Sequence, residues 1–395
     1  MLRFAIATAI PFLLITLAAL QGGVWVWLAL GYLILLVAIM DRLIAAEARN
    51  ADPDAEFPAA TALLVALGIA HFALLAVAVW SVAGPSGLAT AERIAVTVAA
   101  GMFFGQISHP VAHELIHKPS RRLRLLGKWI YTTLLVGHHA SAHLLVHHVH
   151  VGSDADPNSA PRGESFYRFA WRATREAFRA GLVAENRRRS GRSRPVLTHP
   201  YALYLGGGAL TLLTAHVIAG WAGIAALLAM AVYAQVQILM SDYVQHYGLR
   251  RRTLADGRAE PVGPQHSWNA PHVFSSALML NAPRHSDHHV TPSRLYPALQ
   301  LDPGAMPCLP RPLPVMAAVA LVPPLWFRIM DPRCERWVAA SRGGGPRNTP
   351  PLENASGLPR VHLSHSNHET ALHDSQPAHR LPGAGRQRRD ERRGI

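Results

Sequence analysis

The sequence predicts an all-α integral membrane protein with six transmembrane helices, a histidine-rich site at the cytoplasmic face and a disordered C-terminal tail. Half of the 395 residues are hydrophobic and only 16% are charged, which is typical of a membrane protein and not of a soluble globule. Several apolar runs are long enough to cross a bilayer, and the arginines gather in the loops between them.

The apolar runs give the positions of the helices. A helix needs about 20 residues to cross the hydrocarbon core of a bilayer. The predicted spans cover residues 4–20, 24–41, 59–83, 92–116, 201–219 and 221–243. We expect the last two spans to form a hairpin that is joined near Gly220.

Positive charge gives the orientation. Arg42 and Arg49 follow the second span, five basic residues lie between 118 and 128, and nine arginines lie between 168 and 194. The positive-inside rule therefore places the N-terminus, these loops and the region after the sixth span in the cytoplasm. The net charge of +14 indicates membrane orientation and not nucleic-acid binding, since no RNA-binding or DNA-binding motif occurs.

Three further segments differ from the spans. Residues 126–148 are apolar but interrupted by histidines, and we expect a helix at the cytoplasmic face. Residues 315–330 contain Pro323 and Pro324, which break a helix, so they predict an interfacial segment. From residue 341 onward large apolar residues are few, as in disordered chains. The chain is thus divided into a membrane domain, residues 1–340, and a tail, residues 341–395.

Histidine is unusually frequent, with 23 residues, and nine of them form four spaced groups. The groups are His113 and His117; His143, His147 and His148; His246; and His285, His288 and His289. Histidines four apart share a helix face and can aim at one metal, whereas adjacent ones point about 100° apart and can serve different metals. All four groups lie at the cytoplasmic face of the predicted topology. A catalytic zinc uses three protein ligands, so nine histidines favour a pair of close redox metals.

Acidic residues near these groups are expected to orient the imidazoles through hydrogen bonds. They are Glu114, Asp154, Asp156, Asp242 and Asp287. No catalytic residue besides the metal centre is expected.

Two alternatives stay open. Residues 113–117 also fit the H-E-x-x-H pattern of zinc proteases, with Glu114 as the general base, but this leaves seven histidines unexplained. A metal transporter would place its ligands near the bilayer midplane and not at one face.

Five motifs carry a family resemblance. They are HELIHK (113–118), H-x-x-x-H-H (143–148) followed by DPNSAPRGESFYRF (156–169), DYVQHYGL (242–249), HSWNAPHVFSS (266–276) and RHSDHHVTPSRLYPAL (284–299). In this order they resemble the integral-membrane alkane 1-monooxygenases, or alkane omega-hydroxylases, of the fatty acid desaturase and hydroxylase superfamily. This sequence departs from the family at Ala142 and Val146, where the second motif usually has glutamate and glycine.

The resemblance implies O2-dependent terminal hydroxylation of medium-chain n-alkanes to 1-alkanols at a non-haem di-iron centre. The iron ligands that it implies are His113, His117, His143, His147, His148, His246, His285, His288 and His289. It also implies electrons from NADH through a rubredoxin reductase and a rubredoxin. From the orientation that the positive charges predict, we expect the site on the cytoplasmic side of the inner membrane.

The partners and the substrate follow from the same resemblance. This chain has two cysteines, Cys308 and Cys334, and no C-x-x-C pair, so the rubredoxin must be a separate protein. We expect the hydrocarbon to enter an apolar channel between the spans, with candidate residues in the first three. A membrane hydroxylase or desaturase of another hydrocarbon, such as a methyl-aromatic or a fatty acyl chain, stays an alternative.

Overall fold

The computed structural model describes residues 1–43, 49–191 and 195–343. Within these ranges the chain is helical, and its only β pairings are two isolated bridges, Thr253 with Ala259 and Asn269 with Cys308. The predicted all-α class is therefore confirmed. Of the predicted tail, residues 341–343 end the last helix, and residues 344–395 lie outside the described residues.

Five helices in the described ranges are long and apolar enough to cross a membrane. They are α1 (Leu2–Gln21); the continuous helix of α2 (Val24–Leu30), η1 (Gly31–Leu36) and α3 (Val37–Leu43); α4 (Pro58–Ala83); the continuous helix of α5 (Thr90–Phe103), η2 (Phe104–Ser108) and α6 (His109–Ile116); and α11 (Pro200–His246). The first four match the first four predicted spans to within a few residues.

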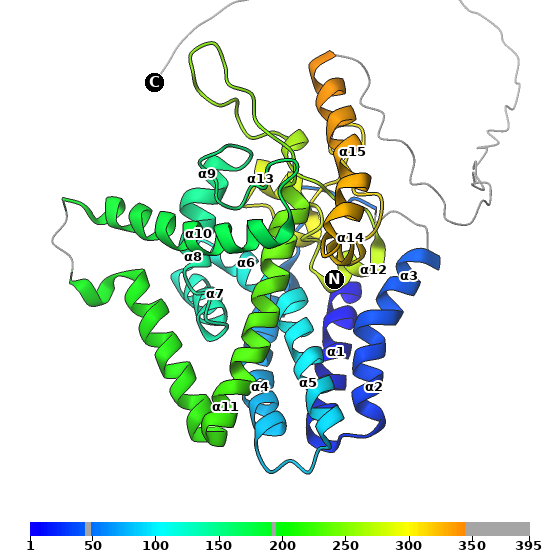
Figure 1. Cartoon of the computed structure of the whole chain (residues 1–395), viewed down its shortest axis with the longest axis vertical. Helices are drawn as coiled ribbons and strands as arrows, with labels where there is room; N and C mark the ends of the chain where they lie inside the picture. The colour runs from blue at the N-terminus through cyan, green and yellow to red at the C-terminus, as the bar shows by residue number, and fades with distance from the viewer. Residues whose placement is uncertain (44–48, 192–194, 344–395) are drawn as a thin grey trace, which may run out of the picture. The chain divides into compact units, whose positions relative to one another are not determined.

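The fifth long helix, α11, covers both of the remaining predicted spans. Its 47 residues would extend about 70 Å as one straight helix, roughly twice the thickness of the hydrocarbon core. The helical conformation breaks at Ala219 and Gly220, where Gly220 has a φ of 60°. The chain reverses direction at this break, so α11 consists of two arms (Figure 1). The reversal near Gly220 is observed, and the sixth crossing stays a prediction.

Glu92 ties the connections together at the end of the bundle near this reversal. Its carboxylate accepts hydrogen bonds from the backbone N–H groups of Ala89, at the start of α5, and of Gly23, between α1 and α2. The N···O distances are 2.8 Å and 2.6 Å. One side chain thus caps a helix and joins two loops that are far apart in the sequence.

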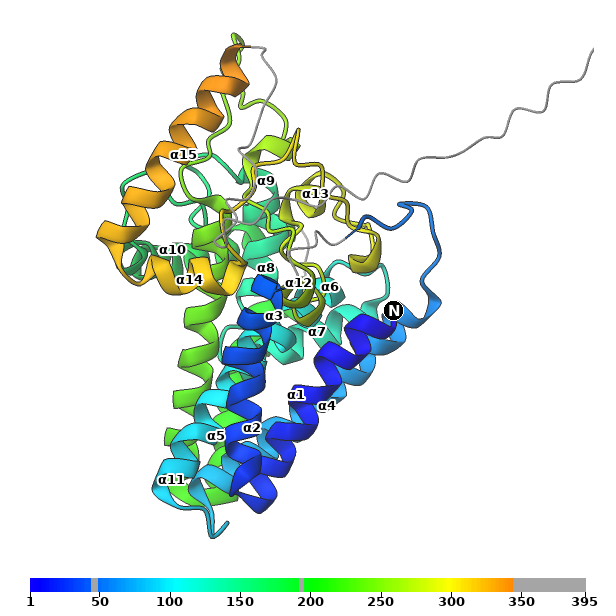
Figure 2. The same cartoon turned by 90° about the vertical axis from the view of Figure 1, so that its right-hand side faces the viewer.

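The remaining helices gather at the opposite end of the five long apolar ones (Figures 1 and 2). They are α7 (Arg121–Thr133), α8 (His139–Ala142), η3 (His143–His147), α9 (His148–His150), α10 (Phe166–Arg189), η4 (Val196–Thr198), η5 (Pro264–His266), α12 (Val273–Leu278), α13 (His285–Val290), η6 (Tyr296–Ala298), α14 (Leu313–Ala320) and α15 (Pro323–Gly343).

The two apolar stretches that are interrupted by histidines or prolines, residues 126–148 and 315–330, compare differently with their predictions. Residues 126–148 do not form the single helix that we predicted, because α7 ends at Thr133 and α8 begins only at His139. Leu135, in the turn between them, has a φ of 58°, which ends the helix. The break before Pro323 is as predicted: α14 ends at Ala320, and the proline pair forms the first turn of α15.

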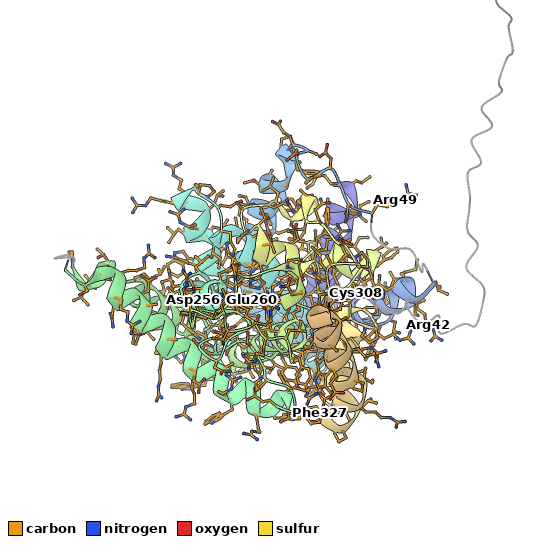
Figure 3. The ribbon with its side chains drawn as sticks, turned by 90° about the horizontal axis from the view of Figure 1, so that it is seen from above. Arg42, Arg49, Asp256, Glu260, Cys308 and Phe327 are labelled. Carbon is orange, nitrogen blue, oxygen red and sulfur yellow. The ribbon has the colours of Figure 1, made fainter. Side chains whose placement is uncertain are left out.

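The loop after the second span reaches the same end of the molecule as the short helices. The side-chain oxygen of Asn50 accepts hydrogen bonds from Arg284 Nη1 at 2.7 Å and from the backbone N–H of Leu301 at 3.0 Å. Arg42 and Arg49 lie at the rim of this end in the view from above (Figure 3). The loop after the second span thus contacts the segment that carries His285, His288 and His289.

Candidate metal centre

The nine predicted ligands come from four segments of the chain. They are His113 and His117 at the end of α6; His143, His147 and His148 in η3 and α9; His246 at the end of α11; and His285, His288 and His289 in α13. Each of these segments is a helix or the end of one, so the backbone fixes the direction of the rings. All four segments meet at one end of the long helices.

The structure brings the nine histidines together in two groups. The first group, here called the five-histidine group, contains His113, His117, His143, His148 and His288. The second, the four-histidine group, contains His147, His246, His285 and His289. Within each group one nitrogen of every ring lies within 4.8 Å of the others. The groups adjoin, since the ring centroids of His148 and His289 are 4.7 Å apart.

A π-helical turn explains how one short segment serves both groups. In a π-helix the hydrogen bonds join residues five apart, so residues at this spacing lie close together. His143 and His148 follow this rule, with their Nε2 atoms 2.9 Å apart. His147, next to His148 in the sequence, points instead to the four-histidine group. The adjacent residues His288 and His289 are divided in the same way, with His288 in the five-histidine group and His289 in the four-histidine group.

The contacts in the five-histidine group form a chain of nitrogens. The Nε2 atom of His143 lies 3.1 Å from that of His117 and 2.9 Å from that of His148. The Nε2 atom of His148 lies 3.2 Å from that of His288. Nitrogens that bind one metal at about 2.1 Å are separated by about 3.0 to 3.4 Å, so these distances fit a shared ion.

The four-histidine group has the same geometry around His285. Its Nε2 atom lies 3.0 Å from Nε2 of His246 and 3.1 Å from Nε2 of His289. His147 completes the group, with its ring centroid 4.7 Å from that of His246. All four rings are buried.

Hydrogen bonding among the histidines cannot satisfy these nitrogens. A neutral imidazole nitrogen either carries a hydrogen and donates, or is bare and accepts. The Nε2 atom of His143 contacts two other nitrogens, and so does the Nε2 atom of His148. Since each Nε2 atom has either one hydrogen or one lone pair, the three contacts cannot all be hydrogen bonds. The Nε2 atoms of His113 and His147 are buried and have no hydrogen-bond partner in the described part of the chain. A cation in each group would satisfy all of them, so the donor set fits a metal centre.

Asp156 is the predicted carboxylate that contacts a ligand. Its Oδ2 atom lies 2.9 Å from Nδ1 of His147 and accepts a hydrogen bond from Ser159 Oγ at 2.7 Å. Burial alone raises the pKa of Asp156, but His147 and the hydrogen bonds from Ser159 and Asn158 outweigh it and hold the pKa below its ordinary value. The ionised carboxylate therefore fixes the His147 ring with Nε2 toward the other histidines.

Asp242 supports this arrangement through an asparagine. Asn158 donates from Nδ2 to Asp242 Oδ2 at 2.6 Å, and its backbone N–H donates to Asp156 Oδ1 at 3.1 Å. We singled out neither Asn158 nor Ser159 from the sequence. The signal was present in the run Asp-Pro-Asn-Ser, because short polar side chains after an aspartate commonly bond back to it in turns.

The other three carboxylates have different partners. Glu114 pairs with Lys118 at 3.3 Å, and Asp287 accepts hydrogen bonds from Arg294 and, at 2.9 Å, from the backbone N–H of Gln300. The side chain of Asp154 is fully exposed, at 102%, and pairs with Arg250 at 3.6 Å. Their described contacts join neighbouring elements to the site and do not reach a histidine ring.

The comparisons with known proteins agree with the motifs. The fatty acid desaturase family model matches residues 92–302. Alkane 1-monooxygenase 2 of Pseudomonas aeruginosa is 30% identical over 323 residues, which cover 80% of this chain and 85% of the relative. Alkane 1-monooxygenase of Pseudomonas putida is 32% identical over 271 residues, which cover 68% of this chain and 66% of the relative.

A more distant relative has a different name. The xylene/toluene monooxygenase hydroxylase component XylM of Pseudomonas putida is 27% identical over 244 residues, 58% of this chain and 61% of the relative. The chain therefore belongs to the fatty acid desaturase family and, within it, to the alkane 1-monooxygenases, which makes it an oxidoreductase.

Proposed function

We propose that this protein hydroxylates the terminal methyl group of medium-chain n-alkanes with O2, at a non-haem pair of iron ions. The observation that carries the proposal is the division of nine histidines into adjoining groups of five and four. Two metal ions side by side need about this many nitrogen donors, and a single zinc site would leave most of them without a role. The names of the relatives supply the substrate class.

The nine histidines would hold the irons, five residues at one ion and four at the other. When bound, a pair of irons supplies the oxidising power that attack on an unactivated C–H bond requires. The protein's own task is to fix the ligands and to keep water away. Asp156 fixes His147, and the burial of the four-histidine group excludes bulk solvent from that half of the centre.

An alkane has no polar group, so burial and shape must hold it. Each buried CH2 contributes about 0.8 kcal/mol, which makes chain length the natural basis of selectivity. The continuous helix that leads to His113 carries buried apolar residues before it reaches the site, including Phe103, Phe104 and Val111. An apolar route between the long helices would bring one methyl group to the histidines. The residues of that route stay a prediction, with candidates in the first three spans.

Electrons would come from a separate rubredoxin, supplied by an NADH-dependent reductase. His117 and His148 are partly exposed, so the five-histidine group approaches the surface of the protein, whereas the four-histidine group is buried. We expect the N-terminus, this surface and the tail to face the cytoplasm, in the inner membrane.

Iron content and product analysis test the proposal together. The purified protein is supplied with a rubredoxin, its reductase, NADH and alkanes of graded length. We expect about two irons per chain and 1-alkanols, with a maximum at one range of chain lengths. Two bound irons without alcohol from any alkane would contradict the substrate. One zinc and no iron would contradict the metal centre.

The second candidate is hydroxylation of a methyl-aromatic compound. The relative that is named as a xylene/toluene monooxygenase component favours it, although this relative matches a smaller part of the chain. Xylene and a fatty acyl substrate in the same assay separate the candidates. Benzylic alcohol without alkanol would favour the aromatic substrate, and an alkene product would indicate a desaturase.

A further inference from the structure

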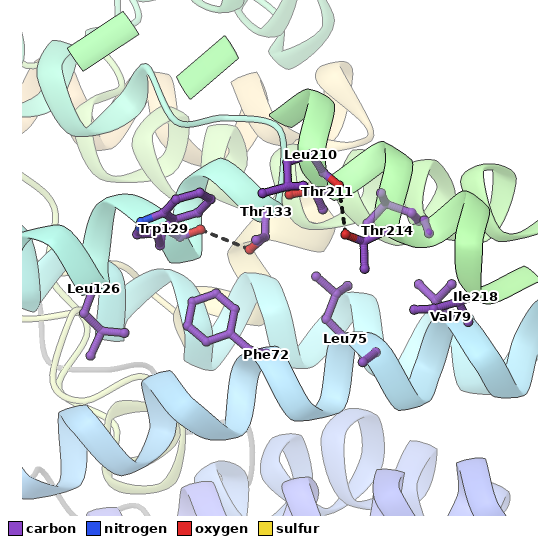
Figure 4. Close-up of a pocket in the computed structure, with 13 residues that line it drawn as sticks. Phe72, Leu75, Val79, Leu126, Trp129, Thr133, Leu210, Thr211, Thr214 and Ile218 are labelled. Carbon is purple, nitrogen blue, oxygen red and sulfur yellow. Dashed lines mark hydrogen bonds between the residues drawn. The ribbon is translucent and has the colours of Figure 1, made fainter. Parts of the chain in front are cut away.

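An apolar pocket of about 420 Å³ lies between α4, α7 and α11, and none of the nine histidines lines it (Figure 4). Phe72 and Val79 mark its extent along α4, Trp129 lines it from α7, and Leu210 and Ile218 line it from the first arm of α11. At 1.5 Å per residue, the lining along each long helix extends over about 10 to 12 Å. The pocket thus extends along two long apolar helices, α4 and the first arm of α11.

The three hydroxyl groups in its wall are already bonded. Thr211 and Thr214 donate to backbone carbonyls one turn earlier in α11, at 2.8 Å and 2.9 Å. The hydroxyl of Thr133 lies 3.1 Å from the carbonyl oxygen of Trp129 (Figure 4). It also lies 2.9 Å from Nε2 of His71. A bound water needs two to four polar partners, and the wall offers few polar groups of any kind. The wall therefore suits an unbranched hydrocarbon chain.

The exposed side chains around the pocket indicate that such a chain comes from the bilayer. Leu213 and Val217, on the same arm of α11, have exposed fractions of 58% and 77%. Exposed apolar side chains on a membrane helix face lipid tails. A lipid tail gains little hydrophobic energy on moving from the bilayer into an apolar pocket. Charge at the headgroup is therefore what can retain one particular lipid.

Positive charge is present on α7 beside the pocket. Lys128 lies between the lining residues Leu126 and Trp129 in α7, and Arg124 lies one turn before it on the same helix face. Burial, together with the charges of Arg124 and Arg188, lowers the pKa of Lys128. Glu185 is the one carboxylate that acts on it in the opposite direction. Arg124 and Lys128 thus place two cations on one face of α7 next to the lining residues, and such a pair favours an anionic headgroup.

We propose that the pocket holds one acyl chain of an anionic phospholipid, with the phosphate against Lys128. The proposal does not depend on the hydrocarbon that the enzyme oxidises. The lipid fills the space between α7 and α11 just before the turn of residues 134–138, which leads to three of the nine histidines. It therefore braces the segment that carries His143, His147 and His148.

Native mass spectrometry of the detergent-solubilised full chain tests the chain and the headgroup separately. We expect one tightly bound phosphatidylglycerol, and weaker binding of phosphatidylcholine with the same acyl chains. Thr214→Phe, which fills the pocket, should weaken phosphatidylglycerol binding at least tenfold. The matched control, Leu213→Phe, adds the same ring on the lipid-facing side and should leave binding unchanged.

The headgroup contact has its own pair of variants. Lys128→Gln should abolish the preference for phosphatidylglycerol over phosphatidylcholine, whereas Arg122→Gln, an exposed position on the same helix, should preserve it. Equal effects of the two variants in either pair would overturn the proposal.

A photoactivatable probe avoids dependence on any variant. Phosphatidylglycerol with a diazirine in its acyl chain should label peptides of α4, α7 and the first arm of α11 in the unmodified protein. A diazirine-bearing alkane serves as the second arm of the experiment. Labelling of these peptides by the alkane but not by the lipid would show a hydrocarbon site and overturn the proposal, as would lipid labelling spread evenly over all exposed helices.

Discussion

The Nδ1 nitrogen of His147 lies 2.9 Å from the Oδ2 oxygen of Asp156, in a contact that is buried on both sides. His147 is the only member of the four-histidine group that comes from η3, and its Nε2 atom has no hydrogen-bond partner in the described part of the chain. The carboxylate thus determines which way this ring faces.

Replacing Asp156 by alanine should weaken the metal centre. Loss of such an outer partner typically costs about 10- to 100-fold in metal affinity or activity. Iron per chain and the rate of alcohol formation measure the effect. Asp154→Ala is the matched control, because its exposed side chain pairs only with Arg250 among the described contacts, and it should change neither quantity. A similar loss in both variants would contradict the assigned role of Asp156.

Single ligand replacements should lower the iron content below two per chain. His117→Ala removes a donor from the five-histidine group, and His246→Ala removes one from the four-histidine group. Elemental analysis of the purified variants measures the loss, and hydroxylation should fall with it. His150→Ala is the control, since this residue lies two positions after His148 but belongs to neither group. Full iron in the His246 variant would exclude that residue as a ligand.

Glu114→Gln should destabilise the protein without removing its chemistry. Glu114 and Lys118 form a buried pair at 3.3 Å, and loss of one partner leaves the other charge buried. The expected cost is on the order of 3 kcal/mol, seen as a lower melting temperature. The double variant Glu114→Gln, Lys118→Met should recover much of it. Complete loss of hydroxylation with full iron would instead give Glu114 a chemical role in the reaction.

Gln235→Leu should loosen the turn that precedes the η3 histidines. Gln235 Nε2 donates to the carbonyl oxygen of Leu134 at 2.7 Å, and a buried carbonyl without its partner costs about 1 to 3 kcal/mol. Thermal unfolding measures the change. Val236→Leu, a partly exposed position beside it on α11, should have little effect. An unchanged melting temperature for Gln235→Leu would show that another group holds the turn.

Deletion of residues 344–395 should leave hydroxylation and iron content intact, because the composition of this segment predicts a tail without a packed core. The deletion begins after α15, which ends at Gly343. Loss of activity in a truncated protein with full iron would contradict this prediction.

The sequence predicted the features that depend on local patterns. The long apolar runs determine where the membrane helices lie, and the grouped histidines indicated the residues that meet. The reversal near Gly220 was also predicted, because glycine tolerates the positive φ that the chain adopts there. Adjacent histidines such as His147 and His148 do point to different groups.

The features that were missed depend on tertiary contacts. The π-helical turn of η3 brings His143 next to His148. The sequence of this segment does not indicate a π-helix, so this pairing could not be predicted. The turn at Leu135 is held from outside by Gln235, so residues 126–148 alone predicted a continuous helix. Carboxylates close in sequence to histidines were all expected to orient them, yet Asp154 points into solvent. Proximity along the chain does not give direction in space.

The origin of the ligands in four distant segments has a consequence for the biogenesis of the enzyme. The five-histidine group needs His288 and the four-histidine group needs three residues from 246 onward, so neither can close while only the first two hundred residues have been made. Loading of a metal into either group must therefore follow insertion of all the long helices. A chain that stalls before α13 would contain incomplete sets of imidazoles. A metal that binds after α13 is in place would join the four segments and stabilise the completed bundle.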